Sequence, residues 1–256
     1  MAEESRHDST VRPLSRQKRW LNLLVYHVHD ARLRKQAATY LKGRLIDIGC
    51  GVKPYEDIVA PYVTQHVGVD HKSTPHDKRR IDLLGTAYTI PAETASFDSA
   101  LCTAVLEHLE EPERAIRECY RVLIPGGIAI YSVPFIWHIH EAPRDFYRYS
   151  KYGLTYLFQK AGFEIVELEA LSGFWLTFGQ LFVYYLYRFN RGPIRWLHLV
   201  DLLGLAIQLV SYALDKLDKA EEWTWMYMVV VRKPHAARQP SLAGPAFDAG
   251  SGRASH

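Results

Sequence analysis

The chain has 256 residues, of which 48% are hydrophobic, so it can bury the core of one ordinary domain and is not intrinsically disordered. Its formal net charge is only +3, and its lysines and arginines are scattered along the sequence. A nucleic-acid-binding protein usually concentrates basic residues in a stripe, so no nucleic-acid partner is predicted.

The three cysteines, Cys50, Cys102 and Cys119, are an odd number and form no CxxC pair. A disulfide framework is therefore not expected, and no metal site is predicted. The N-terminal residues are polar and lack the apolar stretch of a secretion signal, which makes a cytoplasmic location the expectation. Residues 1–17 are interpreted as a flexible arm.

Apolar residues recur at helical intervals from Trp20 to Leu41, and Gly43 supplies a stop. This pattern predicts a leading amphipathic helix or a pair of helices.

Beyond this segment, short apolar runs alternate with helical patterns. A helix is expected over residues 110–123, where Pro112 suits the first turn. Strands alternating with helices indicate parallel pairing through right-handed crossovers, so the predicted fold class is an open, doubly wound, mostly parallel α/β sheet. The predicted strands are residues 44–48, 66–69, 99–103, 128–133, 163–168 and 223–231.

The first predicted strand runs into two glycines, in the sequence LIDIGCGVKPY that begins at Leu45. Ligands of an open α/β sheet bind beyond the carboxyl ends of the strands, where a side chain at Gly49 or Gly51 would block the ligand or forbid the turn. Asp70 ends the next strand, at the place of a ribose-binding carboxylate. A dinucleotide loop would need a third glycine where Pro54 stands, which disfavours NAD but leaves an NAD-type oxidoreductase as the second enzyme class.

Six motifs follow one another in a fixed order from Leu45 to Pro134. They are DIGCG at 47–51, VGVD at 67–70, IP with SFD at 90–98, VLEHL at 105–109, RVLIPGG at 121–127 and YSVP at 131–134. Together they resemble the motifs of the class I S-adenosylmethionine-dependent methyltransferases. The resemblance implies a Rossmann-like methyltransferase fold, S-adenosyl-L-methionine as cofactor and methyl transfer as the activity.

The same resemblance implies which residues would bind the cofactor. Asp47 would lie near the methionine ammonium, Asp70 would accept both ribose hydroxyls, and His71 would lie beside the adenine. Lys53 stands where many relatives have a glycine, and Thr86 stands where many have an acid that meets the adenine amino group. The implied cofactor-binding residues are Asp47, Gly49, Cys50, Gly51, Asp70, His71, Thr86 and Thr103.

The segment PFIWHIHEAPRDFYRYS at 134–150 is dense in polar side chains beside aromatic rings. Because it follows the carboxyl end of a strand, we interpret it as the acceptor-binding surface. His140 is the preferred general base, since imidazole titrates near neutral pH. The alternative is a structural loop, with an ion pair between Arg144 and Asp145 and with His108 as a helix cap. The catalytic candidates are His140, His108 and Asp145, and the substrate-binding candidates are His138, Arg144, Tyr147 and Arg148.

The stretch HEAPRDFYRYS, followed by a helix and AGF, resembles a bacterial methyltransferase subgroup with a DFYRY-type loop that is associated with cell-surface glycan or lipid-linked precursors. This resemblance implies O-methylation of a glycosylated, lipid-linked or otherwise partly apolar small-molecule acceptor. A non-catalytic, membrane-associated scaffold is the non-enzymatic alternative, suggested by the departures at Lys53 and Thr86.

An apolar segment interrupts the chain before the last predicted strand. Residues 170–187 carry no charge, and Arg188, Arg191 and Arg195 follow directly. A helical insertion over about 172–220 would form a lid, cover the sheet or bury a dimer face. Alternatively, residues 172–214 would lie in a membrane interface at the inner face of the membrane. The methyltransferase domain is expected at 18–234, and a disordered tail at 235–256.

Overall fold

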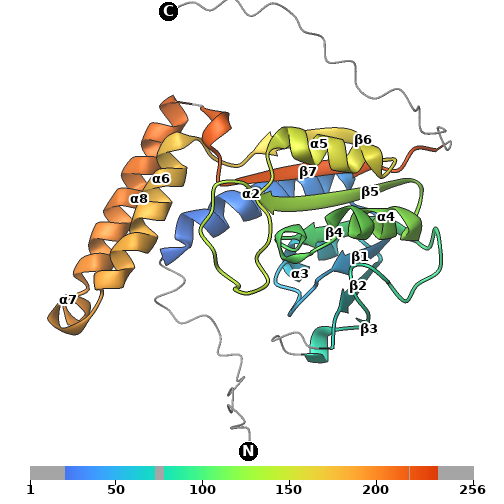
Figure 1. Cartoon of the computed structure of the whole chain (residues 1–256), viewed down its shortest axis with the longest axis horizontal. Coiled ribbons are helices and arrows are strands. Elements are labelled where there is room, and N and C mark those ends of the chain that lie inside the picture. Colours follow the sequence, from blue (N-terminus) through green and yellow to red (C-terminus); the bar gives the residue numbers. More distant parts are fainter. Residues whose placement is uncertain (1–20, 73–77, 219, 236–256) are drawn as a thin grey trace, which may run out of the picture.

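The computed structural model describes residues 21–72, 78–218 and 220–235. Within these residues, seven strands form one sheet in the order β3-β2-β1-β4-β5-β7-β6 (Figure 1). The arm expected at 1–17 and nearly all of the tail expected from 235 onward lie outside the described residues. The strands are β1 (Arg44–Ile48), β2 (Gln65–Asp70), β3 (Leu83–Leu84), β4 (Phe97–Thr103), β5 (Leu123–Pro134), β6 (Glu164–Ala170) and β7 (Met226–Arg232).

Strands β1 to β5 pair in parallel, and β7 pairs antiparallel with β5 on one side and with β6 on the other. The predicted fold class, a mostly parallel α/β sheet, is therefore confirmed. The chain leaves β1 toward β2 on one side and later returns to place β4 on the other side, so the topological switch point lies between β1 and β4. A crevice for a ligand is expected at the carboxyl ends of these two strands.

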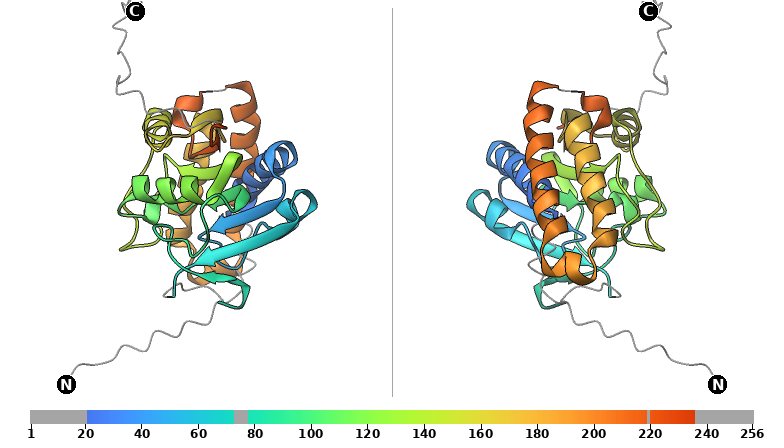
Figure 2. Two further views of the ribbon diagram at one scale, coloured as in Figure 1. Left: turned by 90° about the vertical axis from the view of Figure 1, so that its right-hand side faces the viewer. Right: turned by 90° about the vertical axis from the view of Figure 1, so that its left-hand side faces the viewer.

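Helices cover both faces of the sheet (Figures 1 and 2). Helices α2 (Leu23–Tyr40) and α3 (Glu56–Val59) contribute Leu33 and Ile58 to a core that contains Ile130 of β5. Helices α4 (Pro112–Val122) and α5 (Lys151–Lys160) contribute Ile116 and Phe158 to a second core on the opposite face. Successive residues of the buried strands alternate between these cores, as the pleat of a strand requires.

The predicted helix at 110–123 ends slightly earlier than expected. Helix α4 stops at Val122, and Leu123 already belongs to β5 and pairs with Phe97 of β4. Gly126 and Gly127, which follow soon after, lie inside β5, where the N–H of Gly126 donates to the carbonyl of Lys233 at 2.7 Å.

The segment between β6 and β7 forms a helical hairpin that extends beyond the end of the sheet (Figure 1). It contains α6 (Phe174–Leu186), the short α7 (Gly192–Trp196) at the tip, and α8 (Leu199–Leu217). Helices α6 and α8 run side by side in both turned views (Figure 2). Asp215 of α8 accepts hydrogen bonds from the N–H groups of Gly173 at 2.9 Å and Leu176 at 3.1 Å, and so ties the end of α8 to the start of α6.

The hairpin is anchored to the domain at its root. Gln180 of α6 donates to the carbonyl of Leu21 at 2.8 Å, and Leu176 packs in the core beside Leu33 of α2. Among the described helices, none has both the length and the apolar character needed to cross a membrane.

Candidate cofactor and acceptor site

The turn after β1 has a backbone that favours glycine at two positions. Gly49 has φ +71° and Gly51 has φ +50°, and a Cβ atom on Gly49 would lie 2.6 Å from the side chain of Val105. The N–H groups of Gly49 and Cys50 both donate to the carbonyl of Val69, at 2.9 and 3.2 Å. The loop is thereby held across the carboxyl ends of β1 and β2.

Asp70, at the end of β2, fastens this loop from the other side. One carboxylate oxygen accepts from the N–H of Gly51 at 3.0 Å, and the other accepts from the N–H of His71 at 2.7 Å. A carboxylate has about four acceptor positions in all, so Asp70 can accept more than one hydrogen bond on each oxygen. The imidazole of His71 is half-exposed beside Asp70.

Asp47 is buried in β1 and pairs with a histidine that the sequence analysis did not single out. Its Oδ2 lies 2.9 Å from Nε2 of His66, a residue of β2. Burial is the largest influence on the pKa of Asp47 and raises it, against the opposing effect of the hydrogen bond with His66. The strand register, which places Leu45 opposite His66, brings the two side chains together.

Lys53 has a positive φ of +54°, a backbone conformation that favours glycine. Its side chain is buried, and Nζ donates to Oδ2 of Asp82 at 2.6 Å and to the carbonyl of His66 at 2.9 Å. The ammonium group of Lys53 therefore lies beside β2, and the carboxylate of Asp82 balances its charge.

The two predicted threonines lie in different surroundings. Thr103 ends β4 and is half-buried. Thr86 is exposed, and its backbone pairs with that of Thr89 in a small turn after β3.

A hollow of about 360 Å³ lies at the other end of the strands, at their amino ends. It is lined by the first residues of three strands, Arg44, Gln65 and Phe97, and by none of the predicted site residues. Ligands of this fold are expected at the carboxyl ends, so we assign no role to this hollow.

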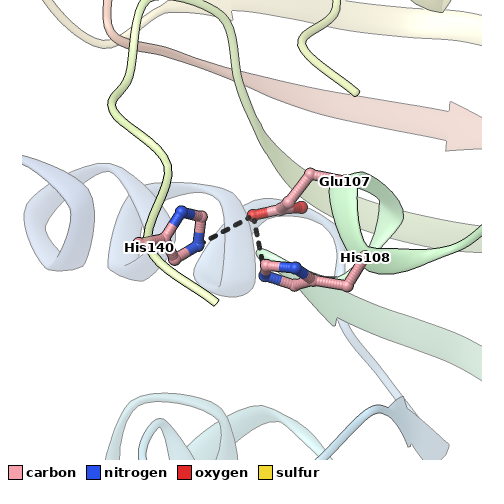
Figure 3. Close-up of side chains that lie close together, drawn as sticks. All are labelled: Glu107, His108 and His140. Carbon is pink, nitrogen blue, oxygen red and sulfur yellow. Dashed lines mark ion pairs between the residues drawn. The ribbon is translucent and has the colours of Figure 1, made fainter. Parts of the chain in front are cut away.

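At the carboxyl ends of β4 and β5, two predicted catalytic histidines meet a buried glutamate (Figure 3). Glu107 and His108 lie on the 3-10 helix η3 (Leu106–His108) after β4, and His140 lies on the loop after β5. Oε1 of Glu107 is 3.7 Å from Nε2 of His108 and 4.0 Å from Nε2 of His140. We call these three residues the Glu-His-His cluster.

Each imidazole of the Glu-His-His cluster has an oxygen atom of the 134–150 loop close to its Nδ1 atom. Nδ1 of His108 lies 2.5 Å from the carbonyl oxygen of Arg144, and Nδ1 of His140 lies 3.2 Å from Oδ2 of Asp145. Asp145 is itself held by a two-pronged ion pair with Arg148, which keeps the pKa of Asp145 well below its usual range. Burial, followed by the neighbouring ring of His108, lowers the pKa of His140.

The third member of the cluster, Glu107, was not among the residues predicted from the sequence. Its side chain is 1% exposed, and neither carboxylate oxygen has a hydrogen-bond partner among the described residues. Burial raises its pKa to about 8. The acid within VLEHL was visible, but its isolation from hydrogen-bond donors follows only from the folded packing.

The structural alternative for the 134–150 loop is wrong in its pairing. Arg144 donates to Glu110 at 3.0 Å, whereas Asp145 pairs with Arg148. Tyr147 also reaches this region, because its hydroxyl donates to the carbonyl of Glu110 at 3.1 Å.

Two further substrate candidates connect the loop to its surroundings. The guanidinium of Arg148 donates to the carbonyls of Trp137 at 3.2 Å and His138 at 2.9 Å, so this side chain holds the loop together. The ring of His138 lies 4.6 Å from that of Tyr184 on α6, measured between centroids. The loop therefore touches the root of the helical hairpin.

Comparison with known proteins places residues 46–131 in a family model described as a methyltransferase domain. The chain is 30% identical over 127 residues to a ubiquinone biosynthesis O-methyltransferase of Stutzerimonas stutzeri, covering 45% of this chain and 52% of that protein. It is 26% identical over 133 residues to a Mycolicibacterium smegmatis protein named as an S-adenosylmethionine-dependent methyltransferase, covering 50% of each. The chain spans about half the length of these relatives.

Solved structures share the fold at low sequence identity. A [4+2]-cyclase matches with a TM-score of 0.55 and 22% identity, over 86% of this chain and 95% of that one. Phosphoethanolamine N-methyltransferase 2 of Haemonchus contortus, in complex with S-adenosyl-L-methionine, matches with a TM-score of 0.51 and 16% identity, over 80% of this chain and 52% of that one. The family model and the curated relatives therefore show that residues 46–131 are similar to a methyltransferase domain, and one of these relatives is named for the use of S-adenosylmethionine.

Proposed function

We propose that this methyltransferase transfers the methyl group of S-adenosylmethionine to an oxygen of a partly apolar small molecule, either lipid-linked or glycosylated. One observation carries the proposal. The glycine loop and Asp70 lie at the same end of the sheet as the Glu-His-His cluster. Strands β1, β2, β4 and β5 run in parallel, so their carboxyl ends lie together.

The cofactor would lie across the switch point between β1 and β4. The backbone of Gly49, Cys50 and Gly51 would line the cofactor. Asp70 would accept hydrogen bonds from the ribose hydroxyls, and Asp47 would lie near the methionine ammonium. His71 and Thr86 would border the adenine, and Thr103 the methionyl part. This arrangement extends the sulfonium toward η3, which begins a few residues beyond the end of β4.

The reaction is an in-line displacement, for which the protein mainly has to hold sulfur, methyl group and acceptor oxygen in alignment. The bond from methyl carbon to sulfur breaks and its electron pair stays on sulfur, while a carbon–oxygen bond forms. The acceptor hydroxyl gives up its proton at the Glu-His-His cluster, where Asp145 orients His140 and Arg144 orients His108 through its carbonyl oxygen.

The acceptor class is inferred from the surroundings of this cluster. The 134–150 loop combines His138, Arg144 and Tyr147 with exposed aromatic rings, and His138 contacts Tyr184 of the hairpin. The Stutzerimonas relative is named for ubiquinone biosynthesis, which favours a hydroxyl on a molecule with an apolar part. An acceptor with an apolar tail could place that tail toward α6 and its hydroxyl at the cluster.

The hairpin offers an apolar surface with a basic tip, which supports contact with a membrane interface through residues 172–214. An apolar groove of about 450 Å³ lies between α6 and α8 and includes Phe178 and Phe182. Arg188, Arg191 and Arg195 are exposed near the tip. In a lipid headgroup layer, the guanidinium groups of arginine and aromatic rings both make favourable contacts. Exposed apolar side chains of the hairpin include Trp175, Phe182, Tyr185, Phe189, Trp196 and Leu202.

Methyl transfer is tested with labelled S-adenosylmethionine and a matched pair of acceptors, a prenylated catechol and catechol itself, with an alkyl glycoside as a third. We expect label on the oxygen of the prenylated catechol or of the glycoside, and at least ~10-fold less on catechol. The reason is that burying an apolar tail in the acceptor site favours binding. Transfer to an amine or carbon of added amphiphiles, with none to oxygen, would refute the O-methylation.

Membrane contact is tested by flotation with vesicles that contain anionic lipid. We expect the protein to float at low salt, and less of it to float when Trp196→Ser removes a ring that is 80% exposed at the tip. The matched control is Tyr152→Ser on α5, whose ring is 76% exposed but far along the chain from the hairpin. Protein that stays in the bottom fraction at low salt contradicts the interfacial proposal.

A further inference from the structure

We infer that the Glu-His-His cluster is a binding site for a divalent transition-metal ion, which holds the oxygen of the acceptor beside the sulfonium. The metal site itself stands on the geometry of Glu107, His108 and His140. Its role in methyl transfer rests on the proposed function.

The three ligand atoms lie close to the spacing that a metal ion imposes. Each residue offers one atom, and these atoms all lie within 4.8 Å of one another. Metal–ligand bonds of about 2.0–2.2 Å place ligand atoms roughly 3–3.5 Å apart around one ion. The distances from Oε1 of Glu107, 3.7 Å to His108 and 4.0 Å to His140, reach that range through small side-chain rotations.

The imidazoles are oriented as metal ligands usually are. A histidine that binds a metal through one ring nitrogen almost always donates the other N–H to a carbonyl or carboxylate. Here Nδ1 of His108 faces the carbonyl oxygen of Arg144, and Nδ1 of His140 faces the carbonyl oxygen of His138 at 3.4 Å and Oδ2 of Asp145 at 3.2 Å. A proton on each Nδ1, directed at these acceptors, leaves each Nε2 with a lone pair, and both Nε2 atoms face Glu107 (Figure 3).

Glu107 supplies an independent second observation. A carboxylate this deeply buried normally has hydrogen-bond partners, because desolvating an unpaired anion is costly. Both of its oxygens lack a partner among the described residues. Arg148, a neighbouring cation, already forms its ion pair with Asp145 and donates to three backbone carbonyls, those of Trp137, Tyr147 and His138. A divalent ion between Glu107 and the histidines would supply the missing partner.

The ligand set indicates the class of ion. Two imidazoles and one carboxylate suit Zn²⁺, Mn²⁺, Fe²⁺ and Co²⁺, whereas Mg²⁺ and Ca²⁺ prefer oxygen ligands. Three protein ligands leave positions open for water or substrate. Glu141, whose Oε2 lies 3.8 Å from Nε2 of His108, has an exposed side chain at the rim and could close one of them.

The open positions give the ion a chemical role. An acceptor hydroxyl that replaces a water on the ion becomes more acidic, so in the metal-bound state its proton goes to solvent instead of to the side chains of the cluster, and the oxygen attacks as an alkoxide or phenolate. Two neighbouring hydroxyls would bind the ion together and fix the reacting oxygen. In this state Nε2 of His140 serves as a ligand, and the ion takes over the activation that a general base would provide.

Binding is measured by titrating the full chain, first stripped with a chelator, with Zn²⁺, Mn²⁺ and Mg²⁺ in separate calorimetric experiments without S-adenosylmethionine. We expect one site per chain for Zn²⁺ and Mn²⁺, with Mg²⁺ at least ~10-fold weaker. Absence of a saturable site for both transition metals overturns the inference.

Variants locate the site. Glu107→Gln, which keeps the shape of the side chain, and His140→Ala should each weaken Zn²⁺ binding by at least ~10-fold, since each removes one of three ligands. The control His198→Ala removes an exposed histidine that contacts a single carboxylate, Asp201, and should leave the affinity unchanged. Unchanged affinity in both Glu107→Gln and His140→Ala overturns the inference.

A spectroscopic readout covers the case in which a variant fails to fold. Mn²⁺ bound to the unmodified chain should show magnetic coupling to ¹⁴N of coordinated imidazole in pulsed electron paramagnetic resonance, and a spectrum with no ¹⁴N coupling overturns the inference. S-adenosylhomocysteine binding is titrated separately. Metal binding without S-adenosylhomocysteine binding refutes the methyltransferase proposal alone, and the reverse refutes the metal site alone.

Discussion

Lys53 and Asp70 show how single residues shape the loop after β1. A non-glycine residue in the left-handed region costs about 1–2 kcal/mol, and the bonds from the Lys53 ammonium to Asp82 and to the carbonyl of His66 offset that cost. Asp70 closes the loop from the cofactor side through Gly51 and His71. The loop is therefore shaped before the cofactor arrives.

Asp70→Asn should weaken S-adenosylhomocysteine binding by at least ~10-fold. The amide keeps the size of the side chain but has a single acceptor oxygen, which cannot serve Gly51, His71 and a ribose diol together. Calorimetric titration measures the effect. The control is Asp57→Asn on α3, an exposed acid of the same type. An unchanged dissociation constant for Asp70→Asn would argue against its contact with the ribose.

At the scale of elements, Glu118 and Arg121 connect α4 to the loop that precedes β4. Glu118 accepts from the N–H of Ile90 at 2.7 Å and from Arg121 at 2.8 Å, and Arg121 donates in turn to the carbonyls of Ile90 and Ala92. The hydrogen bond from Arg121 is the main cause that lowers the pKa of Glu118. This pair fixes the IP motif against the helix.

Glu118→Gln should lower the free energy of unfolding by about 1 kcal/mol at pH 7, since the pair is partly solvated. The folded pKa lies below the unfolded one, so the contribution is present above the ordinary glutamate pKa and is lost as the pH falls through the folded value. Urea unfolding at pH 7 and at about pH 3 measures both states. A difference in the free energy of unfolding between variant and parent that persists in acid would contradict this account. The control is Glu113→Gln, which removes a carboxylate that pairs with Arg117 on α4.

The close approach of α6 and α8 depends on Gly179. A Cβ atom there would lie 2.0 Å from Oγ of Ser211, so Gly179→Val should force the two helices apart and destabilise the hairpin by about 1–3 kcal/mol. Hydrogen exchange of α6 and α8 should become faster, with S-adenosylhomocysteine affinity unchanged. Gly153→Ala on α5, where the added atom meets only ordinary contacts, is the control. Unchanged exchange in α6 and α8 would show that the helices adjust without separating.

The sequence was informative about elements and about the loop after β1, because both follow from local patterns. The bounds predicted for β1, residues 44–48, are those of the structure, and the glycines at 49 and 51 have the positive φ that the turn requires. The Glu-His-His cluster was not predicted, since Glu107 and His140 are brought together only by the pairing of β4 with β5. The pairing of Asp145 with Arg148 rather than Arg144 depends on how the loop folds over Glu107.

For the molecule as a whole, binding of a ligand by the folded state alone raises its stability. S-adenosylhomocysteine at 100 times its dissociation constant should add about 2.7 kcal/mol and raise the melting temperature by about 5–10 °C. The same concentration of NADH should leave the melting temperature unchanged. A shift with NADH and none with S-adenosylhomocysteine would favour the oxidoreductase alternative.

The position of β7 has a consequence for how the protein is made. Among the described strands this is the last in sequence, yet it lies between β5 and β6 and pairs with both along its length. Until residues 226–232 leave the ribosome, one edge of β5 stays open and β6 has no neighbour, while the aromatic hairpin has already emerged. A nascent chain thus exposes unpaired strand edges until residues 226–232 emerge, and a ribosome that stalls before Met226 would release a polypeptide prone to aggregate.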